Sequence, residues 1–354
     1  MTFGPNAYIP VLKVKRGEKR ALAQVAPAIR ARIVPLLEVV ERQPDKSTLS
    51  SHLDTAFGGL AEGVEGYTRF MLDTRELESE GSAAAANVFD RAASVGLKFT
   101  PVTGVTRTHD VAATLQYEAR GVALRLTRAE FEQGDLPIRL EQFLVEHGLD
   151  PSAVDLIVDL GAADDMVAEG IANLTSAFLA VVPAWPSWRT FSIVGCAFPL
   201  NLAKISAHTH AVVERAEWKA WRDYLHAHRS ELDRLPTFGD HAIQHVKGVE
   251  GFDPRLHAVS AAVRYALPAD WLLIKGQSTR VRPPSDQFPV LARRLVSGDL
   301  KAHFRGGGHC AGCLDIALAA QGAPKLGSAE AWRRLGTIHH LTVAAEQIAA
   351  LTWP

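Results

Sequence analysis

The sequence is poor in cysteine: only Cys196, Cys310 and Cys313 occur in 354 residues. Three cysteines cannot build a disulfide framework, so a small disulfide-stabilised fold is excluded and a reducing compartment is favoured. Long apolar runs are also absent, since no stretch approaches the ~20 apolar residues that a membrane-spanning helix needs. The N-terminal residues lack the basic start of a signal peptide. We therefore expect a cytoplasmic protein that has no membrane partner.

The chain also lacks an excess of charge of either sign. Its 38 Lys and Arg residues nearly balance 39 Asp and Glu residues, which gives a formal net charge of −1. Such a chain has no overall attraction to nucleic acid. The small basic clusters Arg280 with Arg282 and Arg333 with Arg334 are more typical of a solvated surface than of a phosphate-binding site. We expect that nucleic acid is not the partner.

The composition is otherwise that of a globular protein, with 47% hydrophobic and 22% charged residues. Residues 8–13, YIPVLK, form an apolar run that ends in Lys13, and residues 33–38, IVPLLE, form a second that ends in Glu38. Between them, residues 17–32 are rich in helix-forming side chains. This order predicts two parallel strands joined by a helix, a β-α-β unit.

The alternation of strand-like and helix-like segments continues along the chain. The predicted strands are residues 8–13, 33–38, 67–74, 97–105, 121–127, 154–160, 189–198 and 237–243. Residues 212–232 are predicted to be a helix, because Trp218, Trp221 and Leu225 recur at helical spacing. The alternation predicts an α/β fold, a (β/α)8 TIM-like barrel over residues 1–250, with an open doubly wound sheet as the alternative.

The pattern changes after the eighth predicted strand. Residues 261–267, AAVRYAL, and 271–277, WLLIKGQ, are separated only by Pro268–Asp270, a spacing typical of an antiparallel hairpin. Helical composition follows at residues 288–296, 314–321 and 329–351. Residues 251–354 are therefore predicted to form a C-terminal β-hairpin and a helical cap packed on the barrel.

Four segments carry a resemblance to a known family: YIPVLKVKRGEKRAL, PTFGDHAI, the paired YAL and WLLIKGQ, and SAEAWRRLGTIHHLTVAAEQI. With them the chain resembles, from end to end, the beta protein family, named for a tailed-bacteriophage protein. Members occur in phages and bacterial genomes, often near mobile or defence genes. The resemblance implies a role in bacteriophage biology or antiphage defence, and it implies no particular substrate because the family has no established activity.

Charged residues end most of the predicted strands. Strand ends of a parallel barrel converge on the face where barrel enzymes carry out catalysis. The candidate catalytic residues are Lys13, Glu38, Asp73, Asp159, Asp240 and His340. The candidate substrate-binding residues are Lys15, Arg75, Arg125, Lys275 and Arg305. His340 is included as a proton carrier; since adjacent helical residues point about 100° apart, at most one of His339 and His340 is expected to face the site.

These residues admit several kinds of chemistry. The four carboxylates could hold Mg²⁺ while Lys13 and Arg125 bind an anion, or one carboxylate could act as a general acid or base without metal. A Schiff base on Lys13 or Lys275 is a third, less favoured mechanism. The competing structural interpretation is that these charges pair with one another as a salt-bridged plug.

The segment RGGGHCAGC, residues 305–313, is the most conspicuous local motif. Its glycines could let the backbone approach an anion, or could form a flexible connection into a helix. His309, Cys310 and Cys313 could bind zinc, with His339 or His340 as the fourth ligand, but one CxxC is a weak signal. We therefore rank zinc below Mg²⁺ and favour Cys313 as a buried apolar residue, with Cys310 exposed.

The leading functional hypothesis is a hydrolase or lyase that acts on a small anionic substrate at the C-terminal mouth of the barrel. The alternative is a non-catalytic scaffold that recognises a phage or host protein or a nucleic acid. An open mouth with converging charges would favour the enzyme, and a closed salt-bridged plug would favour the scaffold.

Overall fold

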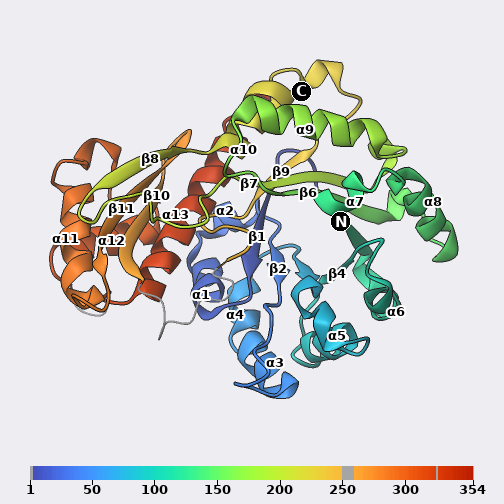
Figure 1. The fold of residues 1–354 in the computed structure, drawn as a ribbon, viewed down its shortest axis with the longest axis horizontal. Coiled ribbons are helices and arrows are strands. Elements are labelled where there is room, and N and C mark those ends of the chain that lie inside the picture. Colours follow the sequence, from blue (N-terminus) through green and yellow to red (C-terminus); the bar gives the residue numbers. More distant parts are fainter. Residues whose placement is uncertain (1–2, 249–258, 324–325, 354) are drawn as a thin grey trace.

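The computed structural model describes residues 3–248, 259–323 and 326–353 (Figure 1). Parallel strands form a closed barrel, in which β1 pairs with both β2 and β9. The barrel strands are β1 (Tyr8–Lys13), β2 (Leu36–Glu38), β3 (Met71–Asp73), β4 (Thr100–Thr103), β5 (Val122–Thr127), β6 (Val154–Ala162), β7 (Thr190–Cys196) and β9 (Thr237–Asp240). The predicted (β/α)8 barrel is confirmed, and the alternative of an open sheet is wrong.

The barrel interior is apolar at mid-height. Val11, Leu36 and Met71 are aligned partners on adjacent strands and belong to one buried cluster, which also includes Ala123 and Ile157. Side chains alternate along a strand, so the residue two positions later points to the same side. The next inward positions toward the carboxyl ends are charged: Lys13, Glu38, Asp73, Arg125 and Asp159. The register therefore places a layer of charges directly above an apolar layer.

Helices cover the outside of the barrel (Figure 1). They are α1 (Arg16–Gln24), α2 (Pro27–Arg30), α3 (Leu49–Phe57), α4 (Leu60–Val64), α5 (Ala84–Ser94), α6 (Thr108–Gln116), α7 (Arg128–Glu132), α8 (Leu136–Glu146), α9 (Ala168–Val181) and α10 (Ala216–Lys219), which continues as a π-helical turn over Ala220–His226. The single helix predicted over residues 17–32 is wrong. It is interrupted because Pro27 disfavours a helical conformation at Ala26, whose ψ is 142°.

A second, antiparallel sheet has the order β10-β11-β8. Strands β10 (Ser260–Ala266) and β11 (Asp270–Ser278) form the predicted hairpin, and β8 (His210–Glu214) adds to the free edge of β11. The helix predicted from residue 212 is therefore wrong at its start. Tertiary pairing with β11 determines the conformation of this segment, and α10 begins only after the strand, at Ala216.

Three helices accompany this sheet: α11 (Pro284–Val296), α12 (Ala311–Ala320) and α13 (Ala329–Ala349). The red helix α13 contacts α12 and β10 on one side and α1 and β1 of the barrel on the other (Figure 1). The predicted division between residues 250 and 251 lies outside the described residues and stays a prediction. Within the described residues, no helix combines the length and the apolar composition that crossing a membrane requires.

Candidate functional site

Arg125 is the centre of the charged layer at the carboxyl ends of the strands. Its Nη1 donates to Glu38 Oε1 at 2.6 Å and to Asp73 Oδ2 at 2.7 Å. Its Nη2 and Nε donate to Asp159 Oδ2 at 2.6 and 3.0 Å. Arg125, Glu38, Asp73 and Asp159 are at most 2% exposed. The fold thus brings together four of the predicted residues, which come from four different strands.

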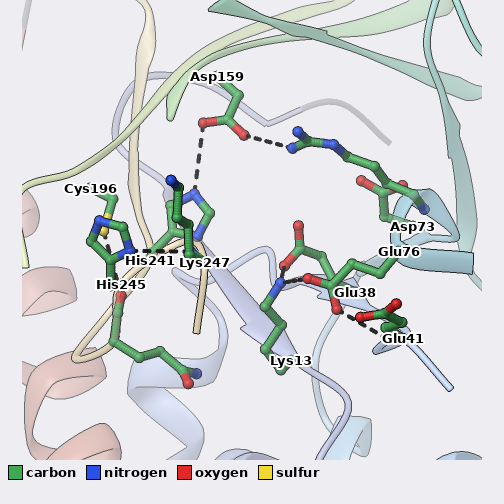
Figure 2. Close-up of polar contacts among 12 residues, drawn as sticks. Lys13, Glu38, Glu41, Asp73, Glu76, Asp159, Cys196, His241, His245 and Lys247 are labelled. Carbon is green, nitrogen blue, oxygen red and sulfur yellow. Dashed lines mark hydrogen bonds and ion pairs between the residues drawn. The ribbon is translucent and has the colours of Figure 1, made fainter. Parts of the chain in front are cut away.

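Further cations and acids complete this layer. Lys13 Nζ lies 2.6 Å from Glu38 Oε2 and also donates to Glu76, as Figure 2 shows. Arg107 Nη1 donates to Asp73 Oδ1 at 2.6 Å. Sequence reasoning missed Glu76 and Arg107 because both lie beyond the strand ends, Glu76 in the 3-10 turn Arg75–Glu80 after β3 and Arg107 in the loop after β4.

The layer is held in its charged state. Burial by itself would raise the pKa of Asp159, but the Arg125 guanidinium holds that pKa well below its usual range. Burial likewise opposes ionisation of Asp73, while the charges of Arg107 and Arg125 lower its pKa. For Lys13 burial is also unfavourable, and the carboxylates of Glu38 and Glu76 raise its pKa. These groups neutralise one another instead of exchanging protons near neutral pH.

The same geometry leaves no room for the predicted Mg²⁺ among these carboxylates. The Arg125 guanidinium lies between Glu38, Asp73 and Asp159, within 2.7 Å of an oxygen of each. A shared divalent cation would need that same position, since its oxygen ligands must surround it at about 2.0 to 2.6 Å. The predicted cation site is therefore filled by an arginine side chain.

Asp240 and His340 form a separate buried pair. Asp240 lies two positions after Phe238, which packs in the outer core, so its side chain points away from the barrel interior. Its Oδ2 accepts from His340 Nε2 of α13 at 2.9 Å, and Tyr8 donates its hydroxyl to the other oxygen. Burial opposes ionisation, but the interaction with His340 lowers the pKa of Asp240 to about 2. Neither residue contacts the Arg125 layer.

A buried acid that sequence reasoning missed lies near this pair. Both carboxylate oxygens of Glu217 are buried without a hydrogen-bond partner among the described residues. Burial and the nearby Asp240 raise the pKa of Glu217 to about 8. No strand-end signal marks this residue, because it lies in α10.

The remaining predicted residues lie in different places. Lys275 donates to the carbonyls of Leu202 and Ile205 at 2.8 and 2.7 Å, beside the antiparallel sheet. Arg305 lies 3.4 Å from Glu346 of α13 and contributes nothing to the barrel mouth. The final two, Lys15 and Arg75, follow β1 and β3 at the rim of the mouth. Lys15 is exposed, and Arg75 is 44% exposed with Nη1 3.8 Å from Asp159 Oδ2.

His241 is the main residue of the mouth that sequence reasoning missed. A Cβ on Gly239 would meet Ile9 and Val194 of the interior cluster, so Gly239 faces inward and His241, two residues later, faces the charged layer. Its Nε2 lies 3.7 Å from Asp159 Oδ1, too far for a hydrogen bond, and has no other partner in the described part of the chain. Figure 2 shows His241 between Asp159 and the neighbouring His245 and Lys247.

A model of the family described as "Beta protein" matches residues 8–346, nearly the whole chain. The chain belongs to the Beta protein family. No curated protein matches it. A solved structure titled as a predicted mandelate racemase from Rhodobacter sphaeroides is 13% identical, with a TM-score of 0.30, and the match covers 77% of this chain and 57% of that chain. The chain thus spans just over half of that protein.

The segments that carry the Beta protein resemblance contribute both to the charged layer and to the separate Asp240–His340 pair. The opening segment supplies Lys13 to the charged layer, and PTFGDHAI supplies His241 to the mouth and Asp240 to the pair. The closing segment supplies His340. Among the described residues, the mouth of this Beta protein is thus a closed, charge-paired layer, in which His241 Nε2 has no hydrogen-bond partner and exposed cations lie at the rim.

Proposed function

We propose that this Beta protein is an enzyme, a hydrolase or lyase, that acts on a small anionic substrate at the barrel mouth. His241 is the residue that transfers the proton. The observation that supports this proposal is the buried Nε2 of His241, which lies 3.7 Å from the ionised Asp159 carboxylate and has no hydrogen-bond partner in the described residues. Imidazole is the side chain most often used as a general acid or base near neutral pH.

The charged layer has a positioning role in this proposal. Asp159 accepts from Arg125 through Oδ2 and from the backbone N–H of Gly161 through Oδ1 at 2.9 Å, so its carboxylate is fixed. A fixed anion beside His241 would stabilise the imidazolium that forms when Nε2 takes a proton from a substrate or a water. The carboxylates of the layer are less suited to this task because Arg125 keeps them ionised.

Cations at the rim would bind the anionic part of the substrate. Within the buried layer, Lys13, Arg107 and Arg125 are balanced by Glu38, Asp73 and Asp159. The attraction would come instead from Arg75, whose side chain is 44% exposed, and from the exposed Lys15 and Lys247. A phosphate or carboxylate group matches these partners.

A non-catalytic scaffold is the second candidate, and a specific observation favours it. The charges of the layer are buried and paired with one another, as in a structural plug. In this case the outer surface of the barrel would recognise a phage or host protein. The phage or defence setting rests on family membership, and the cytoplasmic location rests on the low number of cysteines; both are part of the proposal.

The experiment is a hydrolysis screen with p-nitrophenyl phosphate, bis-p-nitrophenyl phosphate and p-nitrophenyl acetate, and with a panel of phosphorylated and carboxylated metabolites followed by NMR. Losing a general acid or base typically costs 10²- to 10⁴-fold. We expect H241A to lose at least about 100-fold in kcat/KM on any turned-over substrate, while H228A, a change at an exposed histidine, keeps the full rate. Turnover unaffected by H241A would overturn the assignment, and no turnover of any compound would favour the scaffold.

A further inference from the structure

Two cysteines and two histidines meet outside the barrel, where α12 packs against α13. They are His309, Cys310, Cys313 and His339, and one ligand atom of each lies within 4.8 Å of all the others. Within the described residues, no other group of three or more His, Cys, Asp or Glu side chains meets this criterion. The cluster is separate from the barrel mouth and from the proposed function.

The spacing of the ligand atoms fits a tetrahedral metal ion. Cys313 Sγ lies 3.3 Å from His339 Nδ1 and 3.9 Å from His309 Nδ1, and Cys310 Sγ lies 3.9 Å from His339 Nδ1. With zinc–sulfur and zinc–nitrogen bonds of about 2.3 and 2.05 Å, tetrahedral angles place sulfur and nitrogen about 3.6 Å apart. The observed distances lie on either side of this value.

Contacts on the far side of each ring engage Nε2 and leave Nδ1 facing the sulfurs. His339 Nε2 lies 2.9 Å from the carbonyl of Ala266, which can only accept, so Nε2 carries the proton and Nδ1 presents a lone pair to the sulfurs. His309 Nε2 lies 2.9 Å from a carboxylate oxygen of Glu346 and 3.2 Å from Arg305 Nη1, so this nitrogen is engaged on the far side of the ring and Nδ1 faces Cys313. Metal-binding histidines nearly always have such a partner on the second nitrogen.

The surroundings also suit metal-bound thiolates. Cys310 and Cys313 lie at the N-terminus of α12, and the backbone N–H of Cys313 points at Cys310 Sγ at 3.4 Å. The Tyr265 hydroxyl lies 3.4 Å from Cys313 Sγ and accepts from the backbone N–H of Arg305, so its own proton is free to point at the sulfur. A helix N-terminus and N–H or O–H donors both favour negatively charged sulfur.

Two glycines of RGGGHCAGC, Gly306 and Gly312, help to bring these side chains together. A Cβ on Gly312 would lie 2.4 Å from the carbonyl oxygen of Leu335, so only glycine lets α12 approach α13 this closely. Gly306 turns the chain before His309 with a φ of +88°, a value that favours glycine. Close packing on α13 therefore accounts for Gly312, and the turn before His309 accounts for Gly306.

We propose that His309, Cys310, Cys313 and His339 bind one zinc ion. Two thiolates and two imidazoles in a tetrahedral arrangement select zinc among the common divalent metals. Four protein ligands leave no open coordination position, so the ion has a structural role: it ties the start of α12 to α13. The sequence-based preference for Cys310 as an exposed thiol is wrong, because Cys310 is only partly exposed and its sulfur faces His339. His339 lies 29 residues later in the sequence, and the packing of α12 on α13 brings the two side chains together.

The test is the zinc content of the full-length protein, purified from zinc-supplemented cells without chelators and measured by inductively coupled plasma mass spectrometry. We expect about one zinc per chain in wild type and in C196S, which alters the buried cysteine outside the cluster. In C310S and C313S we expect the zinc to be lost. Equal zinc content in C313S and C196S would overturn the proposal.

A second measurement does not depend on any variant folding. Wild-type protein stripped of metal and loaded with Co²⁺ should show the sulfur-to-cobalt charge-transfer band and the intense visible bands of a tetrahedral thiolate site, and one equivalent of Zn²⁺ should bleach them. A wild-type protein that binds neither ion, or that carries a Cys310–Cys313 disulfide after purification under reducing conditions, would contradict the site.

Discussion

Replacing Arg125 with methionine tests the charged layer, because this change keeps an unbranched side chain and removes the central charge. It leaves three carboxylates, Glu38, Asp73 and Asp159, buried without the guanidinium that now lies within 2.7 Å of each. Removing one partner of a buried ion pair costs about 3–5 kcal/mol, so we expect R125M to lose at least about 3 kcal/mol of unfolding free energy at pH 7.

The pH dependence of this loss identifies its cause. In wild type the pKa values of Asp73 and Asp159 are lowered, so their pairing stabilises the fold above their unfolded pKa values near 4 and is lost as the pH falls through the folded values. In R125M burial instead raises the carboxyl pKa values, so the variant becomes relatively more stable on acidification. The difference between the two proteins should therefore shrink between pH 7 and pH 5.

Urea denaturation at both pH values measures the difference in unfolding free energy. The matched control is R128M, which removes an arginine that is 45% exposed and paired with Glu132 one helical turn away. A pair of that kind contributes at most about 0.5 kcal/mol, at either pH. A cost below about 1 kcal/mol for R125M, or a difference that widens at pH 5, would refute the reasoning.

Two further predictions concern other buried positions. Burial raises the pKa of Glu217 to about 8, so the contribution of Glu217 to the stability of wild type falls as the pH rises from 5 to 8. E217Q should therefore gain roughly 3 kcal/mol relative to wild type over that range in denaturation curves. The exposed-site variant E231Q should show no such trend relative to wild type. A Cβ at Gly239 would lie 2.7 Å from the carbonyl oxygen of Ile9, so G239A should lower the unfolding free energy by about 1–3 kcal/mol. A Cβ at Gly308 would have no atom within 4 Å, so G308A should change the thermal midpoint little. Equal midpoints for the two variants would contradict the close packing at Gly239.

The barrel and most of its charged layer follow from local sequence. Each of β1, β2 and β3 is an apolar run that ends in a charged residue. The parallel register aligns these last residues across neighbouring strands, so that their side chains form one layer. Arg125 and Asp159 join for the same reason. Arg107 and Glu76 could not be predicted in this way, because the segments after the strands, and not strand periodicity, bring them to the layer.

The assignments around β9 show where sequence reasoning stops. In TFGDHAI the charged residue at the strand end is Asp240, but the residues that face the barrel interior are Gly239 and His241. The interior is packed so closely at Gly239 that it leaves no space for a side chain. A shift of one residue exchanges the two faces of a strand. His339 and His340 similarly face two different buried groups, and only the position of α13 between the antiparallel sheet and the barrel determines which.

The central claim is that the charged layer stays ionised and supports His241. The most direct test is the carboxyl ¹³C chemical shift of Asp159, followed from pH 7 to pH 4 in the folded protein. Comparison with D159N assigns the signal. Because Arg125 holds the pKa of Asp159 well below its usual range, the signal should not move over this interval. A titration with a midpoint at or above the ordinary value of about 3.9 would contradict the claim.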